Sequence, residues 1–224
     1  VDPVNGCTAQ TSVTVSQNIQ PPTVSAGNDA TLSCAINSLT LTGSGNGQGA
    51  IAYAWTAASG GNILGGANTP SPSIDAPGIY NLTVTDPVNG CTATDAVEIF
   101  EDANAPQANA GPATTLNCLL TQIALDGSGS AGPGISYAWT ASGGGNILSG
   151  ANSLSPLIDA PGAYELLVSN ANNGCTATAT VVIPEDIAQP AVDAGTGSTL
   201  TCAQTSASLS GSATAGNGGT LLFS

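Results

Sequence analysis

One motif recurs along this chain at a fixed interval. The sequence Asn-Gly-Cys-Thr-Ala begins at Asn5, Asn89 and Asn173, so each copy starts 84 residues after the one before it. The remaining cysteines keep the same interval and lie at Cys34, Cys118 and Cys202. Repetition without insertion or deletion predicts a tandem array, in which each unit has the same strands and turns and packs against its neighbours.

Each unit opens at a proline, and this frame predicts the domain boundaries. Two whole repeats are flanked by two partial ones, so we expect the chain to be an internal piece of a longer array. The predicted domains are the C-terminal part of a preceding repeat (1–21), two whole repeats (22–105 and 106–189) and the N-terminal part of a following repeat (190–224).

Hydrophobic residues alternate with polar ones along short segments. Tyr80, Leu82 and Val84 alternate with Asn81 and Thr83, and Gly- and Pro-rich turns separate such segments. This period of two predicts strands with one buried face, and about seven of them fit an 84-residue sandwich. The candidate core residues are Leu39, Leu41, Tyr53, Trp55, Tyr80, Leu82, Val84, Tyr137, Trp139, Tyr164, Leu166 and Val168.

Several segments together resemble a known family. Residues 26–34 (AGNDATLSC), the Tyr-Ala-Trp at 53–55 and residues 76–86 (APGIYNLTVTD) resemble the PKD-like and Ig-like tandem repeats of large secreted or cell-surface adhesins of Bacteroidota-type bacteria. The resemblance covers the whole chain and implies an all-β fold of tandem Ig-like (PKD-like) β-sandwich domains, arranged end to end. The chain departs from PKD domains proper, because Trp55 is followed by Thr-Ala-Ala-Ser-Gly instead of Asp-Phe-Gly-Asp-Gly.

Tyr80 and Tyr164 begin the penultimate strand of each repeat. Their position resembles the tyrosine corner of Ig-type sandwiches, in which the hydroxyl ties down a loop. In antibody-type domains a cysteine follows two residues later, but here Leu82 and Leu166 stand there. The core disulfide of those domains is therefore absent, and the cysteines must lie elsewhere.

The cysteines of a secreted acidic chain predict disulfides. A zinc site is less favoured, because the chain has no His and no Cys-x-x-Cys. Two pairings are open. Ig-like topology places Cys34 and Cys91 at opposite ends of a domain and favours Cys34–Cys175 across the repeat junction, with Cys118 beside a cysteine of a further repeat. The alternative pairs cysteines within repeats, as Cys34–Cys91 and Cys118–Cys175. Under either scheme the candidate disulfide residues are Cys7, Cys34, Cys91, Cys118, Cys175 and Cys202.

The short linkers between repeats are acidic and end in proline, which favours semi-rigid connections. Their carboxylates, Glu101, Asp102, Glu185 and Asp186, are weak calcium candidates. Calcium prefers six to eight oxygen ligands, more than these linkers offer, so a solvated acidic turn is the simpler interpretation and no cofactor is expected.

The charge pattern excludes several partners. The chain has no Lys, Arg or His and a formal net charge of −14, so it cannot neutralise phosphates and we expect no nucleic acid partner. No apolar run approaches the ~20 residues of a membrane-spanning helix, so we expect no membrane insertion in this segment. Without His or a recognisable nucleophile and base, no catalytic residues and no enzyme activity are predicted, and Asp75 and Asp159 are interpreted as loop caps.

These patterns predict a structural protein: a disulfide-stabilised repeat segment of an extracellular fibre or of the stalk of a surface adhesin. Its partners would be further copies of the same repeat in the same chain and neighbouring chains in a filament. One alternative is a glycan- or cell-binding adhesion module that uses the Gly-rich loops at 43–50 and 127–134. The other is a spacer in a giant secreted multidomain enzyme. In each case we expect an extracellular or cell-surface location.

Overall fold

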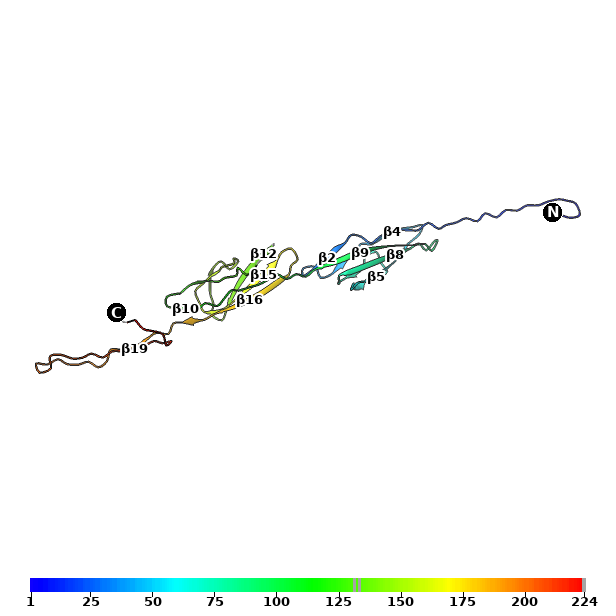
Figure 1. Ribbon diagram of the computed structural model, residues 1–224. Coiled ribbons are helices and arrows are strands. Elements are labelled where there is room, and N and C mark those ends of the chain that lie inside the picture. Colours follow the sequence, from blue (N-terminus) through cyan, green and yellow to red (C-terminus); the bar gives the residue numbers. More distant parts are fainter. Residues whose placement is uncertain (131, 133, 223–224) are drawn as a thin grey trace. The chain divides into compact units, whose positions relative to one another are not determined.

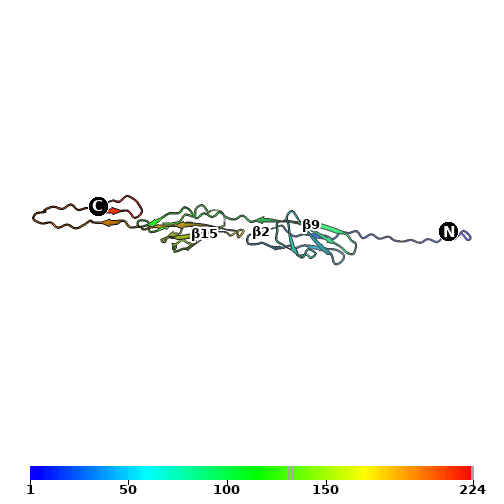
Figure 2. The same cartoon turned by 90° about the horizontal axis from the view of Figure 1, so that it is seen from below.

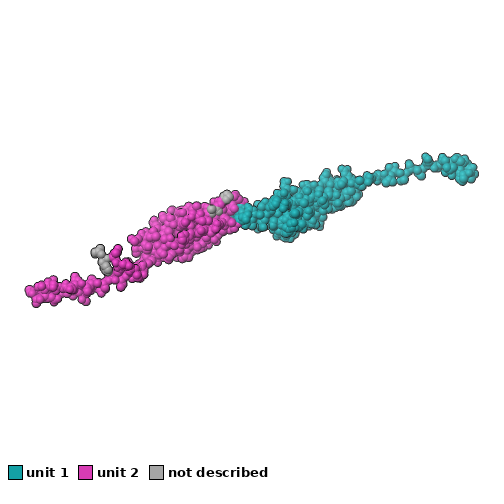
Figure 3. Space-filling model, viewed as in Figure 1, with its two compact units in different colours: residues 1–104, 173–175 teal, residues 105–172, 176–224 magenta. Residues whose placement is uncertain are grey.

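The computed structural model describes residues 1–130, 132 and 134–222, and every regular element in them is a β-strand (Figure 1). They divide into two compact units, coloured separately in Figure 3. The first unit comprises residues 1–104 and 173–175, and the second comprises 105–172 and 176–224. Among the described residues no helix is long and apolar enough to cross a membrane.

The first unit contains nine strands. They are β1 (Thr23–Ser25), β2 (Ala30–Ser33), β3 (Leu39–Thr40), β4 (Ser44–Asn46), β5 (Ala52–Ala58), β6 (Ile63–Gly65), β7 (Ser73–Ile74), β8 (Gly78–Thr85) and β9 (Thr92–Asp102). One sheet has the order β2-β9-β8-β5, a second has the order β3-β7-β6, and β1 pairs with β4. β2 and β9 are parallel and run side by side in both ribbon views (Figures 1 and 2), whereas the other pairs of these sheets are antiparallel.

The hydrophobic core of this unit lies where the two sheets face one another. Tyr80, Leu82 and Val84 of β8 are fully buried, as their alternation requires, and Trp55 of β5 and Ile74 of β7 pack with them. Burial of such side chains is the main favourable term in folding a sandwich of this kind.

The second unit repeats this plan. Its strands are β10 (Leu116–Asn117), β11 (Ile123–Ala124), β12 (Ile135–Ser142), β13 (Ile147–Ser149), β14 (Leu157–Ile158), β15 (Gly162–Asn170), β16 (Thr176–Ile183), β17 (Glu185–Asp186), β18 (Ala191–Asp193) and β19 (Ser212–Thr214). They form the sheets β12-β15-β16 and β11-β14-β13 and the pairs β10–β17 and β18–β19. Tyr164, Leu166, Val168 and Trp139 are buried in its core.

A proline accounts for one difference between the two units. β9 runs unbroken through Phe100, whereas Pro184 separates β16 from β17 at the equivalent position. Proline has no N–H to donate to a sheet, although its carbonyl still accepts from Leu116 N at 2.9 Å. The parallel pairing survives beyond the break, because Leu116 pairs with Glu185 as Leu32 pairs with Glu101.

The two ends of the chain are less structured. Residues 1–20 form no strand, and residues 190–222 contain only the antiparallel pair β18–β19. That pair is 168 residues, or two repeat intervals, after β1–β4 and has the same antiparallel arrangement. The predicted all-β fold of tandem Ig-like sandwiches is confirmed.

Candidate functional site

The cysteines lie on two kinds of turn, and the first is a turn of four residues, 33–36. The Ser33 N–H donates to the Ile36 carbonyl at 2.8 Å, and the Ile36 N–H donates back at 3.1 Å. The Ser33 hydroxyl oxygen also accepts from the N–H groups of Ala35 (3.3 Å) and Ile36 (3.2 Å). The side chain before Cys34 therefore holds the turn, as Ser, Thr and Asn side chains commonly do.

The same four-residue cysteine turn forms in the other two copies, at 117–120 and 201–204. Asn117 Oδ1 accepts from the backbone N–H groups of Leu119 (2.9 Å) and Leu120 (2.8 Å). Thr201 Oγ1 accepts from those of Ala203 (3.3 Å) and Gln204 (3.1 Å). Because the third copy forms it in residues 190–222, which contain only the strand pair β18–β19, the conformation is set by local sequence.

The second kind of turn carries the Asn-Gly-Cys motif. In the copy at 86–91, the Asp86 N–H donates to the Cys91 carbonyl at 2.9 Å, and the Gly90 N–H donates to the Asp86 carbonyl at 2.8 Å. Asn89 Oδ1 accepts from the Cys91 N–H at 2.9 Å. Gly90 has φ +71°, a left-handed conformation that favours glycine, so the motif needs Gly before its cysteine.

This Asn-Gly-Cys turn is also repeated, at 2–7 and 170–175. Asn5 Oδ1 accepts from the Cys7 N–H and Asn173 Oδ1 from the Cys175 N–H, each at 2.9 Å. The glycines at positions 6 and 174 share φ +72°. Local hydrogen bonds thus present Cys7, Cys91 and Cys175 in the same way.

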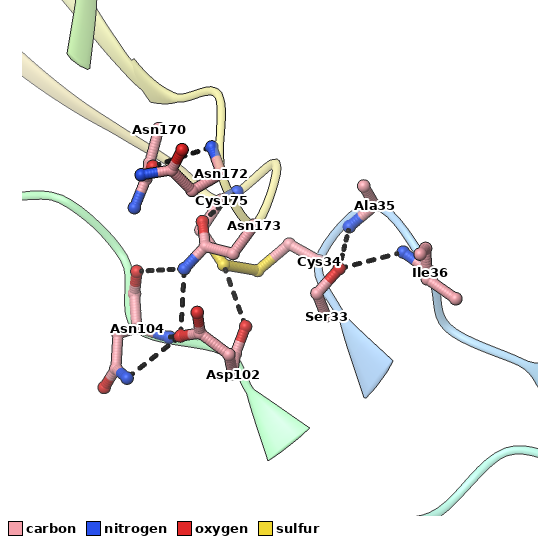
Figure 4. The surroundings of a disulfide bond; sticks show 10 residues. All are labelled: Ser33, Cys34, Ala35, Ile36, Asp102, Asn104, Asn170, Asn172, Asn173 and Cys175. Carbon is pink, nitrogen blue, oxygen red and sulfur yellow. Dashed lines mark hydrogen bonds between the residues drawn. A yellow bond between two sulfur atoms is a disulfide. The ribbon is translucent and has the colours of Figure 1, made fainter. Parts of the chain in front are cut away.

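A disulfide joins one turn of each kind (Figure 4): Cys34 is bonded to Cys175, with Cα atoms 4.9 Å apart. Residues 173–175 belong to the first unit, although β15 and β16 on either side of them belong to the second. Beside the bond, the Ala35 N–H donates to the Asn173 carbonyl at 3.1 Å. A Cβ added to Gly174 would lie 2.5 Å from the Ala35 Cβ, so the turns touch without room for a further carbon.

Asn173 ties this site to the acidic segment that ends the first unit. Its buried amide Nδ2 donates to Asp102 Oδ1 and to the Asn104 carbonyl, each at 3.0 Å (Figure 4). Asn89 makes the equivalent bonds one repeat earlier, to Asn18 Oδ1 at 3.3 Å and to the Gln20 carbonyl at 2.9 Å. The sequence separations, 71 and 69 residues, are the same in both copies, so the Asn amide clamp is a periodic feature.

These bonds change the electrostatics of the acidic segment. The side-chain hydrogen bond from Asn173 is the largest cause that lowers the pKa of Asp102, followed by bonds from Asn104. The pKa of Asp186 is lowered likewise, first by its bond from the Asn217 amide at 2.8 Å. Across the described ranges, no cluster of three or more His, Cys, Asp or Glu side chains could hold a metal ion, so the calcium candidates Glu101, Asp102, Glu185 and Asp186 are not gathered into such a site.

The six candidate cysteines differ in their bonding: two form a disulfide and four are thiols. Neither within-repeat pair of the alternative scheme is formed, since Cys34 is bonded to Cys175 and Cys91 and Cys118 are thiols. The favoured scheme placed the partner of Cys118 in a further repeat, and Cys118 is a thiol within residues 1–224. The free thiols are Cys7, Cys118 and Cys202, which are exposed, and Cys91, which is half-buried.

The candidate core residues differ in their burial. Leu39, Tyr53 and Tyr137 are only half-buried and pack against the cores of their units. The other nine are buried: Leu41, Trp55, Tyr80, Leu82, Val84, Trp139, Tyr164, Leu166 and Val168.

The polar groups of the buried Tyr and Trp side chains form hydrogen bonds with loop residues. The Tyr80 hydroxyl donates to the Ala76 carbonyl at 2.6 Å and accepts from the Asn62 N–H at 2.9 Å. The Trp55 Nε1–H donates to the Thr69 carbonyl at 3.0 Å. Asp75 accepts from the Asn62 side chain at 2.7 Å, as a loop cap does. The equivalent bonds in the second unit involve Tyr164, Trp139 and Asp159.

The Gly-rich loop at 43–50 is tied to its own unit. The Gln48 N–H donates to Asp86 Oδ2 at 2.6 Å, and the Gln48 and Asn18 side-chain amides exchange hydrogen bonds at 2.8 Å. A hollow of about 250 Å³ beside this loop is lined by Gln20, Pro21, Thr23, Asn46, Gly47, Gln48 and Asp86. No aromatic side chain lines it. Of the loop at 127–134, Ala131 and Pro133 lie outside the described residues.

Sequence reasoning missed the Asn amide clamp and the burial of Asp86. Asp86 is 1% exposed, and its oxygens accept from the backbone N–H groups of Gln48 and Val88. A signal existed for the clamp: an Asp or Asn recurs at 18, 102 and 186, at the same interval as the Asn-Gly-Cys motif.

No family model matches the chain. It is similar to an I-band fragment from titin, at 12% identity over 75% of this chain and 66% of that one, with a TM-score of 0.40. It is also similar to the complex of Dpr11 with DIP-gamma (14% identity, 74% and 99% covered, TM-score 0.34) and to the PKD domain from KIAA 1837 protein (25% identity, 38% and 92% covered, TM-score 0.29). At these TM-scores the similarities carry no argument, and the class, a chain of tandem Ig-like β-sandwiches, rests on the strand order described above.

Proposed function

We propose that this chain is a structural repeat segment of an extracellular fibre or surface adhesin stalk, stabilised by disulfides between successive repeats. The observation that carries the proposal is the Cys34–Cys175 bond. Its sequence separation is 141 residues, which exceeds the 84-residue interval of the motif, so the bond cannot close inside one repeat. A disulfide of this kind supplements the peptide linker with a second covalent connection between neighbours.

The periodic Asn amide clamp supports a role in which spacing matters. Asn173 holds Asp102 and Asn104, and Asn89 holds Asn18 and Gln20, so these two Asn-Gly-Cys turns fasten the segments that lead into their own repeats. A linker bound along its length has fewer conformations than a free one. Binding modules joined by flexible linkers would have no need of this repeated fastening.

The chemistry of the chain supports a location outside the cell. Disulfides persist in oxidising compartments and are rare in the cytosol. The chain carries a formal net charge of −14 with charged residues at only 6%, so single molecules repel one another at long range while few charges oppose close contact.

The loops favour a structural role over glycan or cell binding. The loop at 43–50 is fastened by Asp86 and Asn18, and the hollow beside it has a polar lining without aromatic side chains. Sugar-binding sites usually offer an aromatic face, but Trp55 and Trp139 are buried in the cores.

Small-angle X-ray scattering of the oxidised and the reduced chain tests the stapling role. We expect reduction to broaden the distribution of intramolecular distances, because one of two covalent connections is lost, while far-UV circular dichroism stays unchanged. Identical scattering before and after reduction would contradict it. Electron microscopy of the native material tests the fibre role, since thin filaments or stalks are expected, and binding to a glycan array by the intact chain would instead favour the adhesion module.

A further inference from the structure

Two of the turns with free cysteines, those of Cys91 and Cys118, match the two halves of the disulfide site. Cys91 lies on an Asn-Gly-Cys turn with the same hydrogen bond from Cys N–H to Asn Oδ1 as the turn that carries Cys175. Cys118 lies on a four-residue cysteine turn like that of Cys34. Both thiols are free.

The surface beside Cys91 is uncovered, whereas the equivalent surface beside Cys175 is covered by the turn at 33–36. At Gly174 an added Cβ would lie 2.5 Å from the Ala35 Cβ, because the four-residue turn packs directly onto this glycine. At Gly90, with nearly the same φ, an added Cβ would meet nothing within 4 Å. The covered copy therefore identifies what fits at Gly90: a four-residue cysteine turn whose third residue, the one after the cysteine, faces the glycine.

The turn at Cys118 corresponds to the other side of this contact, and it too is uncovered. Ala35, the residue after Cys34, is in contact with the Asn-Gly-Cys turn through its N–H and its Cβ. Leu119 holds the equivalent position and is 98% exposed. The position that is in contact in the first copy is therefore uncovered in this one.

No cysteine within residues 1–224 can fill either half in the observed way. The disulfide joins cysteines 141 residues apart, and no cysteine of this sequence lies at that separation from Cys91 or from Cys118. A partner in the observed geometry would therefore lie on another copy of the repeat, either further along the same chain or in a second molecule.

We propose that the Cys91 and Cys118 turns are docking surfaces for further copies of this same repeat. The Cys118 turn receives an Asn-Gly-Cys turn, and the Cys91 turn receives a four-residue cysteine turn. This inference deepens the proposed function by naming the partner of each junction. With a small disulfide such as oxidised glutathione, one thiolate displaces a glutathione thiol, and the second thiolate then displaces the other glutathione, so that two thiols give one protein disulfide and two reduced glutathiones.

An extended chain tests the pairing directly. Inserting a second copy of residues 22–105 between 189 and 190 places a copy of Cys91 at 141 residues after Cys118. After refolding in a glutathione redox buffer, we expect a Cys118 disulfide to that copy by non-reducing peptide mapping. The two added cysteines then supply one added disulfide overall, so the number of free thiols stays at four, as in the present chain.

Matched variants of the extended chain sharpen the result. Cys118→Ser frees its partner and raises the thiol count by one, whereas the control Cys202→Ser removes a free thiol and lowers the count by one. Two additional free thiols in the parent extended chain, or a bond between cysteines of the same inserted copy, would overturn the proposal.

A second insertion guards against misfolding of the first. A copy of residues 106–189 placed between 21 and 22 brings a copy of Cys118 to 141 residues before Cys91, and the same disulfide is expected. Failure of both chains to reach the native tryptophan fluorescence counts against the proposal, since it requires the repeats to accept one another in either order. The outcomes for the two proposals can be told apart. If the native material forms filaments but lacks the Cys118 disulfide, only the docking proposal is rejected. If the disulfide forms but the native material shows no filaments, only the fibre proposal is rejected.

Discussion

The Asn-Gly-Cys turns at 2–7 and 170–175 have the same local structure and different surroundings. In both, the Asn side chain accepts from the cysteine N–H at 2.9 Å and the glycine has φ +72°. Cys7 is exposed and free, whereas Cys175 is buried and bonded to Cys34. Nothing lies within 4 Å of an added Cβ at Gly6, but Ala35 closes the space at Gly174.

This difference distinguishes the local conformation of the turn from the contacts that it makes with residues distant in sequence. The conformation needs only residues of the turn itself, because it forms at residues 2–7 although residues 1–20 contain no strand. The disulfide, the contact with Ala35 and the Asn amide clamp need residues distant in sequence. The same substitution can therefore be made at equivalent positions in two copies of the turn. The difference between their effects on stability measures the contribution of the distant contacts, because the local effect is the same in both.

The largest effect is expected from removing the disulfide. Cys34→Ser should lower the free energy of unfolding of the first unit by about 2–5 kcal/mol, because the unfolded chain gains the freedom of a long loop. Chemical denaturation followed by Trp55 fluorescence measures it. The matched control, Cys118→Ser, changes the same turn in the second unit without breaking a bond and should stay within about 0.5 kcal/mol of the parent. Equal effects of the two variants would mean that the disulfide adds nothing beyond the turn.

The next effect compares two glycines. Gly90→Ala introduces a side chain at φ +71° into open space, so it should cost only the backbone strain of about 1–2 kcal/mol. Gly174→Ala adds the same strain at φ +72° and a clash with Ala35, for which overpacking costs of roughly 1–3 kcal/mol apply in addition. Denaturant unfolding of each variant gives the difference, and a smaller loss at Gly174 would contradict the contact.

Much of the fold follows from the sequence because its signals are local. The alternation of Tyr80, Leu82 and Val84 is enough to place β8 with one face in a core, and all three side chains are buried. The cysteine turns are encoded by the polar residue before Cys34 and by Asn-Gly before Cys91.

The remaining features depend on contacts that no local pattern encodes. The burial of Asp86 depends on Gln48, 38 residues away. The interpretation of Asp102 as a weak calcium candidate overlooked Asn173, whose amide donates to that carboxylate from 71 residues later in the chain. Pro184 is visible in the sequence, but that β17 resumes the parallel pairing beyond it follows only from tertiary packing.

A smaller effect is expected from Asn173→Asp, which replaces a hydrogen-bond donor by a carboxylate beside Asp102. The variant loses the amide bonds to Asp102 and Asn104 and adds like-charge repulsion, so at pH 7 we expect a loss of stability of about 1 kcal/mol or more. The loss should shrink at acid pH, when one carboxyl is protonated. Asn5→Asp is the control, because Asn5 is exposed and should tolerate the change. Comparable losses in both variants would place the effect in the turn instead of the clamp.

The smallest effect concerns the titration of Asp102. Its pKa is lowered from the ordinary value of 3.8, chiefly by the Asn173 hydrogen bond. A carboxyl whose pKa is lower in the folded state stabilises the fold above its unfolded pKa, and this contribution is lost as the pH falls through the folded value. Asn173→Ala should therefore raise the pKa of Asp102 toward 3.8, while Asn5→Ala leaves it unchanged. Carboxyl chemical shifts followed by NMR between acid and neutral pH measure it. If the pKa of Asp102 is unchanged in Asn173→Ala, the bonds from Asn104 cause the lowering. The hydrogen bond from Asn173 would then have no effect on the charge of the linker.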